Sequence, residues 1–142
     1  GGWTGFTTGY GDPWVGAPPD IVPGDWVEGL VTDNGREAAV HLGTISATLD
    51  IVGDTVAGSF DVPWLGEQVL DGWCAVWADG GPEVSFSARA DGEAFVCDLG
   101  AAGWDLREGQ DIAVGYIDPT GHRVMTVFRE EGYRVFLPLV MR

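Results

Sequence analysis

The stretch TISATLDI, residues 44–51, alternates strictly between polar and apolar side chains. A period of two places successive side chains on opposite faces of an extended chain, so this stretch predicts a strand with one face in a core and one in water. Residues 83–89 repeat the pattern, with Val84, Phe86 and Ala88 as the apolar set. The two stretches together predict a half-buried antiparallel sheet.

The rest of the chain follows the same plan of short strands and tight turns. Turn residues punctuate it at Asn34-Gly35, 79–82, Asp91-Gly92 and 118–121. No stretch has the period of an amphipathic helix, and residues 101–108 form a short turn at most. Many short strands joined by such turns predict an all-β antiparallel sandwich or barrel with almost no helix. Further strands fit residues 26–32, 36–42, 55–60, 73–78, 93–98, 111–117, 122–128 and 133–140.

Composition narrows the classes of partner. The 142 residues carry a formal net charge of −15, and all seven basic residues are Arg. Nucleic acids and anionic membranes need a basic face, so neither is an expected partner. No apolar run approaches the roughly 20 residues of a membrane span, so no membrane insertion is expected. The chain begins Gly1-Gly2-Trp3 without an initiator Met, as a mature or excised form would.

The two cysteines, Cys74 and Cys97, predict one disulfide in an extracellular chain. In a plain meander of strands 73–78, 83–90 and 93–98, the two Cys strands would lie about 9.6 Å apart. A disulfide needs Cα atoms within about 7 Å. The bond therefore requires 93–98 either to cross to an opposite sheet or to pair directly with 73–78. Two buried free thiols are the alternative.

A family resemblance rests on three segments: TVAGS at 55–59, the Trp73-Cys74 strand, and DLREGQDIAV at 105–114. With these, residues 51–128 resemble a bacterial immunoglobulin-like repeat of secreted and cell-surface proteins. The ending YRVFLPLVMR at 133–142 resembles the Leu-Pro-Leu-Val tails of secreted proteins in some thermophilic bacteria. The resemblance implies an immunoglobulin-like β-sandwich, an extracellular or cell-surface location, and a role as stalk, spacer, adhesive module or polymer subunit.

Domain organisation is interpreted on this basis. Residues 1–50 form an N-terminal β segment that resembles the closing half of an immunoglobulin-like unit, because residues 20–25 echo residues 105–110. Residues 51–128 form one immunoglobulin-like unit. Residues 129–142 form a polar hinge and an apolar C-terminal strand. The three parts are compatible with one compact domain.

The sequence lacks several common enzyme motifs. The nucleophile elbow, the zinc-protease helix, the phosphate loop and the dinucleotide fingerprint are all missing. His41 and His122 fall in predicted hairpins and are interpreted as ordinary surface or partly buried residues. The expectation is a protein that is not an enzyme and has no cofactor.

Tryptophan is unusually frequent, with seven residues. Trp73 and Trp77 are expected in the core. Loop tryptophans can stack on sugar rings, as in a carbohydrate-binding module, or can cover the sandwich and fill subunit contacts. The loop set consists of Trp3, Trp14, Trp64 and Trp104.

Acidic turns add a hypothesis of Ca²⁺ binding, since calcium prefers several oxygen ligands. The candidates are Asp33, Asp118 and the turn from Asp50 to Asp54, although none follows a calcium-loop spacing. Asp and Asn in turns usually serve the backbone.

The C-terminal segment is apolar on both faces, which requires burial on both sides. Pro138 cannot donate a ladder hydrogen bond, so it implies an edge or a break. The segment is either the last strand of its own sandwich or a strand donated to a neighbouring copy. The leading hypothesis is an extracellular structural subunit or spacer that forms filaments or oligomers with itself by strand addition; the alternative is a carbohydrate-binding module for a surface glycan. The assembly residues are Val135, Phe136, Leu137, Leu139 and Val140.

Overall fold

The structure is a computed structural model, and it describes residues 5–7, 21–31, 36–76, 80–130 and 134–141. Strands dominate these residues, and their one helical element is the short 3-10 helix η1, Pro63–Leu65. The predicted all-β fold is therefore confirmed. The strands are β1 (Gly5–Thr7), β2 (Trp26–Val31), β3 (Arg36–His41), β4 (Thr44–Asp50), β5 (Thr55–Asp61), β6 (Val69–Val76), β7 (Glu83–Arg89), β8 (Asp91–Asp98), β9 (Asp111–Ile117), β10 (Arg123–Arg129) and β11 (Arg134–Met141).

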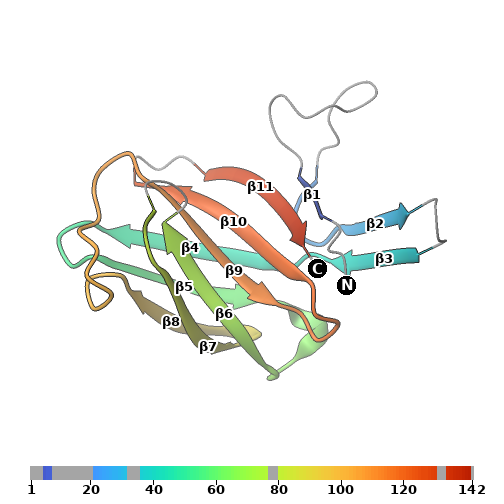
Figure 1. Ribbon diagram of the computed structural model, residues 1–142. Coiled ribbons are helices and arrows are strands. Elements are labelled where there is room, and N and C mark those ends of the chain that lie inside the picture. The colour runs from blue at the N-terminus through green and yellow to red at the C-terminus, as the bar shows by residue number, and fades with distance from the viewer. Residues whose placement is uncertain (1–4, 8–20, 32–35, 77–79, 131–133, 142) are drawn as a thin grey trace.

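The strands form a sandwich with a projecting ribbon. A six-stranded sheet in the order β1-β11-β10-β9-β6-β7 faces a three-stranded sheet in the order β4-β5-β8. Strands β2 and β3 pair with each other and extend beyond one end of the sandwich (Figure 1). All of these pairings are antiparallel, as the alternating sequence predicts.

The core lies between the two sheets and is built around the ring of Phe60, which is fully buried. Phe60 contacts the rings of Phe86, Phe95 and Tyr116 at centroid distances of 5.9, 4.8 and 5.3 Å. Gly72 makes room for this cluster, since a Cβ there would lie 2.5 Å from the Phe86 ring. The apolar faces predicted from the alternation thus meet in one aromatic core.

Tyr116 carries the deepest ionisable group of this core. Its hydroxyl oxygen accepts a hydrogen bond from the backbone N–H of Gly43 at 2.9 Å. Burial raises the pKa of Tyr116 to about 12, against a smaller opposing effect of that hydrogen bond. The neutral phenol is therefore the form that the fold stabilises.

The disulfide joins the two sheets. Cys74 on β6 and Cys97 on β8 are bonded, with their Cα atoms 6.5 Å apart. The chain changes sheets between β7 and β8 at Ala90, where both backbone groups stay satisfied: its N–H donates to Gln68 O at 2.9 Å, and its C=O accepts from Val62 N–H at 2.8 Å. The predicted disulfide is confirmed, and of its two topological solutions the structure adopts the crossing to the opposite sheet.

A second, smaller cluster packs on the other face of the six-stranded sheet. Trp73 is 5% exposed and lies there with Ala113, Met125 and Val127. It is a core residue, as predicted, but on the opposite side of β6 from Cys74. Trp77 lies outside the described residues.

The C-terminal strand joins the sheet of its own chain. β11 pairs with β10 on one side and with β1 on the other. Met125 faces Leu139 and Val127 faces Val135, so three residues of β11, Pro138 among them, stand opposite Thr126 alone. This register shift matches the break that Pro138 predicts, because proline cannot donate to a ladder.

Candidate functional site

The residues singled out in the sequence lie apart from one another. Trp3, Trp14 and Asp33 fall outside the described residues, and of Val135, Phe136, Leu137, Leu139 and Val140 the structure describes the backbone pairing alone. Trp64 lies in η1, Trp104 follows β8, and Asp118 begins the β9–β10 turn. No single site unites them in the part of the chain that the structure describes.

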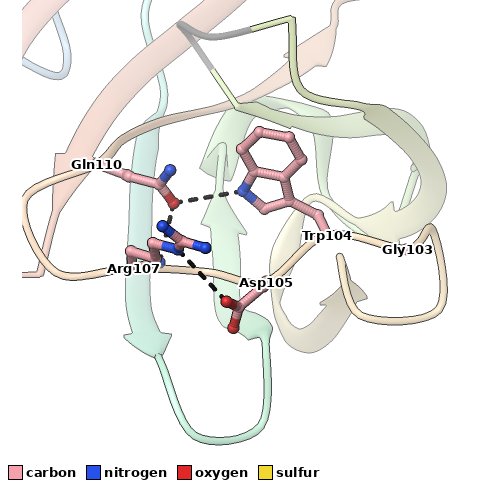
Figure 2. Close-up of a pocket in the computed structure, with 5 residues that line it drawn as sticks. All are labelled: Gly103, Trp104, Asp105, Arg107 and Gln110. Carbon is pink, nitrogen blue, oxygen red and sulfur yellow. Dashed lines mark hydrogen bonds and ion pairs between the residues drawn. The ribbon is translucent and has the colours of Figure 1, made fainter.

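Trp104 borders an open depression of about 390 Å³, together with Gly103, Asp105, Arg107 and Gln110. Figure 2 shows the indole beside Gln110, with Arg107 and Asp105 below it. The indole N–H donates to Gln110 Oε1 at 3.3 Å, and Arg107 Nε donates to Asp105 Oδ2 at 3.3 Å. The ring also packs against the main core, so this tryptophan is half-buried rather than free on a loop.

Trp64 belongs to a stack of three aromatic rings. His41 lies between Trp64, with ring centroids 3.3 Å apart and planes inclined by 12°, and Trp26, at 4.5 Å and 13°. Trp26 and His41 are Cα partners at the base of the β2–β3 ribbon. We name the set Trp26, His41 and Trp64 the ring stack; it joins the ribbon to η1 of the sandwich.

The ring stack has a hydrogen bond at its central ring and is exposed at its ends. His41 Nε2 lies 3.0 Å from the carbonyl oxygen of Gly24, so this nitrogen carries the proton and donates. Trp26 is 63% exposed and Trp64 43%. Because His41 covers one face of each indole, the other face of Trp26 remains open to solvent at the end of the stack.

Trp26 was not among the site residues predicted from the sequence. It begins the strand predicted over residues 26–32, and the sequence pattern gives it no role beyond that strand. Its neighbour Val27 is buried, whereas Trp26 and Glu28 are exposed. The signal that could have found it is a tryptophan on the polar face of a strand, where burial does not account for it.

The Asp118 carboxylate closes a turn. Its Oδ1 accepts from Thr120 N–H at 2.9 Å, from Thr120 Oγ1 at 2.7 Å and from His122 N–H at 2.9 Å. Thr120 Oγ1 lies 2.5 Å from Nδ1 of the buried His122. Since the hydroxyl proton of Thr120 goes to Asp118, the Nδ1–H of His122 donates to the Thr120 oxygen. His122 is therefore not placed to act as a base toward Thr120, as the histidine of a nucleophilic site would be.

The second acidic turn behaves in the same way, because Asp50 Oδ1 accepts the backbone N–H groups of Val52 and Gly53, both at 3.0 Å. Across the described residues, no group of three or more His, Cys, Asp or Glu side chains could hold a metal ion. These aspartates therefore support the backbone, the role that Asp usually has in turns.

Comparison of the chain with protein-family models, with curated proteins and with solved structures finds no match. No helix among the described residues is long and apolar enough to cross a membrane.

Proposed function

We propose that this chain is a structural module of an extracellular assembly, a spacer or subunit, and that it associates by adding β11 to a neighbouring copy. The observation that carries the proposal is the position of β11 between β10 and β1. Neighbouring copies that exchange β11 make the same backbone pairs as the closed chain, so exchange costs no hydrogen bonds in the sheet.

The place of β11 in the strand order explains why it would be exchanged rather than left free. Among the described strands, β11 is the one partner of β1, and it covers the edge of β10. A chain whose β11 has left would expose two unpaired edges, which invite another strand. A strand from a second copy repairs both edges at once.

The connection between β10 and β11 sets the geometry of exchange. Four residues separate Arg129 from Arg134. An extended connection of this length spans about 17 Å. Closed and exchanged forms share their sheet contacts, so protein concentration shifts the balance toward the exchanged form.

The inter-sheet disulfide supports the extracellular part of the proposal. Disulfides that serve structure persist in oxidising compartments and are rare in the cytosol. Cys74 and Cys97 are both buried, so the bond is part of the core rather than an exposed redox pair.

The test compares the full chain with a variant ending at Arg129, by light scattering after size exclusion and by electron microscopy. The proposal predicts oligomers or filaments from the full chain and no strand-exchanged oligomers from the variant, which has open edges but no β11 to donate. A synthetic peptide with the sequence of residues 133–142 should bind the shortened variant, and the same peptide carrying Val140→Asp should bind more weakly. A full chain that stays monomeric at high concentration would contradict the proposal.

A second candidate function, binding of a surface glycan, is favoured by the depression beside Trp104. An indole edge there adjoins Arg107, Asp105 and Gln110, which offer both donors and acceptors to sugar hydroxyls. Glycan-array binding that disappears in Arg107→Ala would support it. Since Arg107 is exposed, this variant should keep the fold, and unchanged binding would exclude the depression.

A further inference from the structure

The open face of Trp26 has a charged neighbour on the same strand. Strand alternation places Glu28 on the same face of the ribbon as Trp26, because Val27 between them is buried. Two residues along a strand span about 6.8 Å. An indole face and a carboxylate therefore lie side by side on the exposed side of the ribbon.

Glu28 has no partner for its charge in the described structure. Its Cα partner on β3 is Ala39, whose methyl group carries no charge to pair with the carboxylate. None of the ion pairs among the described residues involves Glu28. The carboxylate is thus available to a ligand that lies on Trp26.

The same chain shows what completes such a pair. On the six-stranded sheet, the guanidinium carbon of Arg123 stands 5.6 Å from the Trp73 ring centroid. Arg123 Nη1 also lies 3.9 Å from Glu83 Oε1. Indole, carboxylate and guanidinium form one group there, whereas Trp26 and Glu28 supply the first two components and lack the third.

Charge around the ring stack favours a cation. Asp25 precedes Trp26, and Asp61 and Glu67 flank Trp64 in the chain. The whole chain has 22 acidic against seven basic residues, so its field attracts cations and repels anions. A planar guanidinium also fits better than an ammonium, since it stacks parallel to a ring and donates two hydrogen bonds to a carboxylate.

We propose that Trp26 and Glu28 bind an arginine side chain presented by a basic partner protein. The guanidinium extends the ring stack by one planar layer and donates to the Glu28 carboxylate. The chain's net charge of −15 attracts a basic protein to this exposed surface, whereas a second copy has no such attraction for it. This site is independent of β11 exchange.

The probe is a tetra-arginine peptide titrated calorimetrically into the full chain at low salt. Its matched control is the tetra-citrulline peptide, which keeps the shape of the side chains but removes their charge. Tetra-lysine tests the planar geometry. The proposal predicts that arginine binds several-fold more tightly than lysine, that citrulline does not bind, and that added salt weakens binding.

Variants locate the site. Trp26→Leu keeps an apolar side chain without a π face and should lower affinity about fivefold. Glu28→Gln keeps the shape without the charge and should lower it about threefold. The control Glu108→Gln removes one charge from the loop between β8 and β9, at the far end of the sandwich from the ribbon, and should change affinity less than about twofold (Figure 1).

Several results would overturn the proposal. Equal losses in Glu28→Gln and Glu108→Gln, with no loss in the uncharged change Trp26→Leu, would mean general attraction to an acidic surface. Binding of citrulline, or no arginine binding at about 1 mM, would exclude an arginine site. Self-association that Trp26→Leu abolishes would assign the surface to a second copy instead. If circular dichroism shows that Trp26→Leu does not fold, the comparison of affinities between Glu28→Gln and Glu108→Gln still tests the proposal: a loss in Glu28→Gln no larger than in Glu108→Gln contradicts it.

Discussion

Replacing both Cys74 and Cys97 with alanine should destabilise the sandwich without abolishing it. The bridge closes a loop with a sequence separation of 23 residues between the two sheets. In the chain-entropy account, opening a loop of this length restores about 11 cal/mol/K to the unfolded chain, or about 3 kcal/mol at room temperature. Because domains are stable by about 5–15 kcal/mol, a folded state should survive the change.

The measurement is urea unfolding followed by far-ultraviolet circular dichroism. With a urea dependence of about 2 kcal/mol/M, the midpoint should fall by about 1.5 M. The slope should rise slightly, because an unfolded chain without the bridge exposes more surface.

The chemically reduced protein is the matched control for this double variant. It keeps both buried sulfur atoms, so it isolates loop closure from the small cavities that alanine leaves behind. A loss of less than about 1 kcal/mol in both forms would refute the idea that the bridge acts by restricting the unfolded chain.

Three further predictions concern the core and one loop. Gly72→Ala should cost about 1–3 kcal/mol in urea unfolding, because its Cβ would lie 2.5 Å from the Phe86 ring. The contribution of Tyr116 to the free energy of unfolding is full below pH 10 and should fall by about 2–3 kcal/mol between pH 10 and 12, because folding raises the Tyr116 pKa from 10.0 to about 12 and the unfolded chain loses the phenol proton first. Tyr116→Phe should flatten that part of the profile of stability against pH. Asp54→Ala should lower the free energy of unfolding by about 2 kcal/mol, because Asp54 has a φ of 53° and its side chain accepts a hydrogen bond from the Leu106 N–H at 2.8 Å. Asp54→Asn should be tolerated, and equal effects of the two variants would contradict this reason.

The strands were predictable because the two-residue alternation of side chains and the turn residues between the strands indicate the same boundaries. Residues 44–51 and 83–89 alternate strictly, and the structure has strands at Thr44–Asp50 and Glu83–Arg89. The disulfide gave long-range information as well, because its geometry required the strand of Cys97 to leave the meander. The bond joins the two sheets, as that argument allowed.

The elements that the sequence did not predict are those whose formation or length depends on pairing with another strand. β1 is the three-residue segment Gly5–Thr7, too short for any period, and its pairing with β11 spans the whole chain. β6 begins at Val69, before the predicted residue 73, because its pairing with β7 continues through Gly72 and Asp71 to Val69. Periodicity reports the face of a strand, not the length of its ladder.

The ring stack was missed for a related reason. Trp26, His41 and Trp64 come from three elements, and no spacing in the sequence brings them together. Trp64 was a candidate because it lies in a loop, whereas Trp26 was assigned to a strand. Exposure of Trp26 depends on which face of the ribbon packs on the sandwich, and this is settled by tertiary contacts of Val27 and Val40.

The most direct test of assembly through β11 is a cysteine pair across β10 and β11. Met125 and Leu139 are Cα partners, within the span that a disulfide bridges. The chain's own two cysteines are bonded to each other, so they offer no free thiol to compete. The measurement is non-reducing denaturing electrophoresis of Met125→Cys/Leu139→Cys after oxidation of the native assembly. Strand exchange predicts covalently linked dimers and longer ladders, whereas a single band at the mass of one chain, with no free thiol remaining, would contradict it.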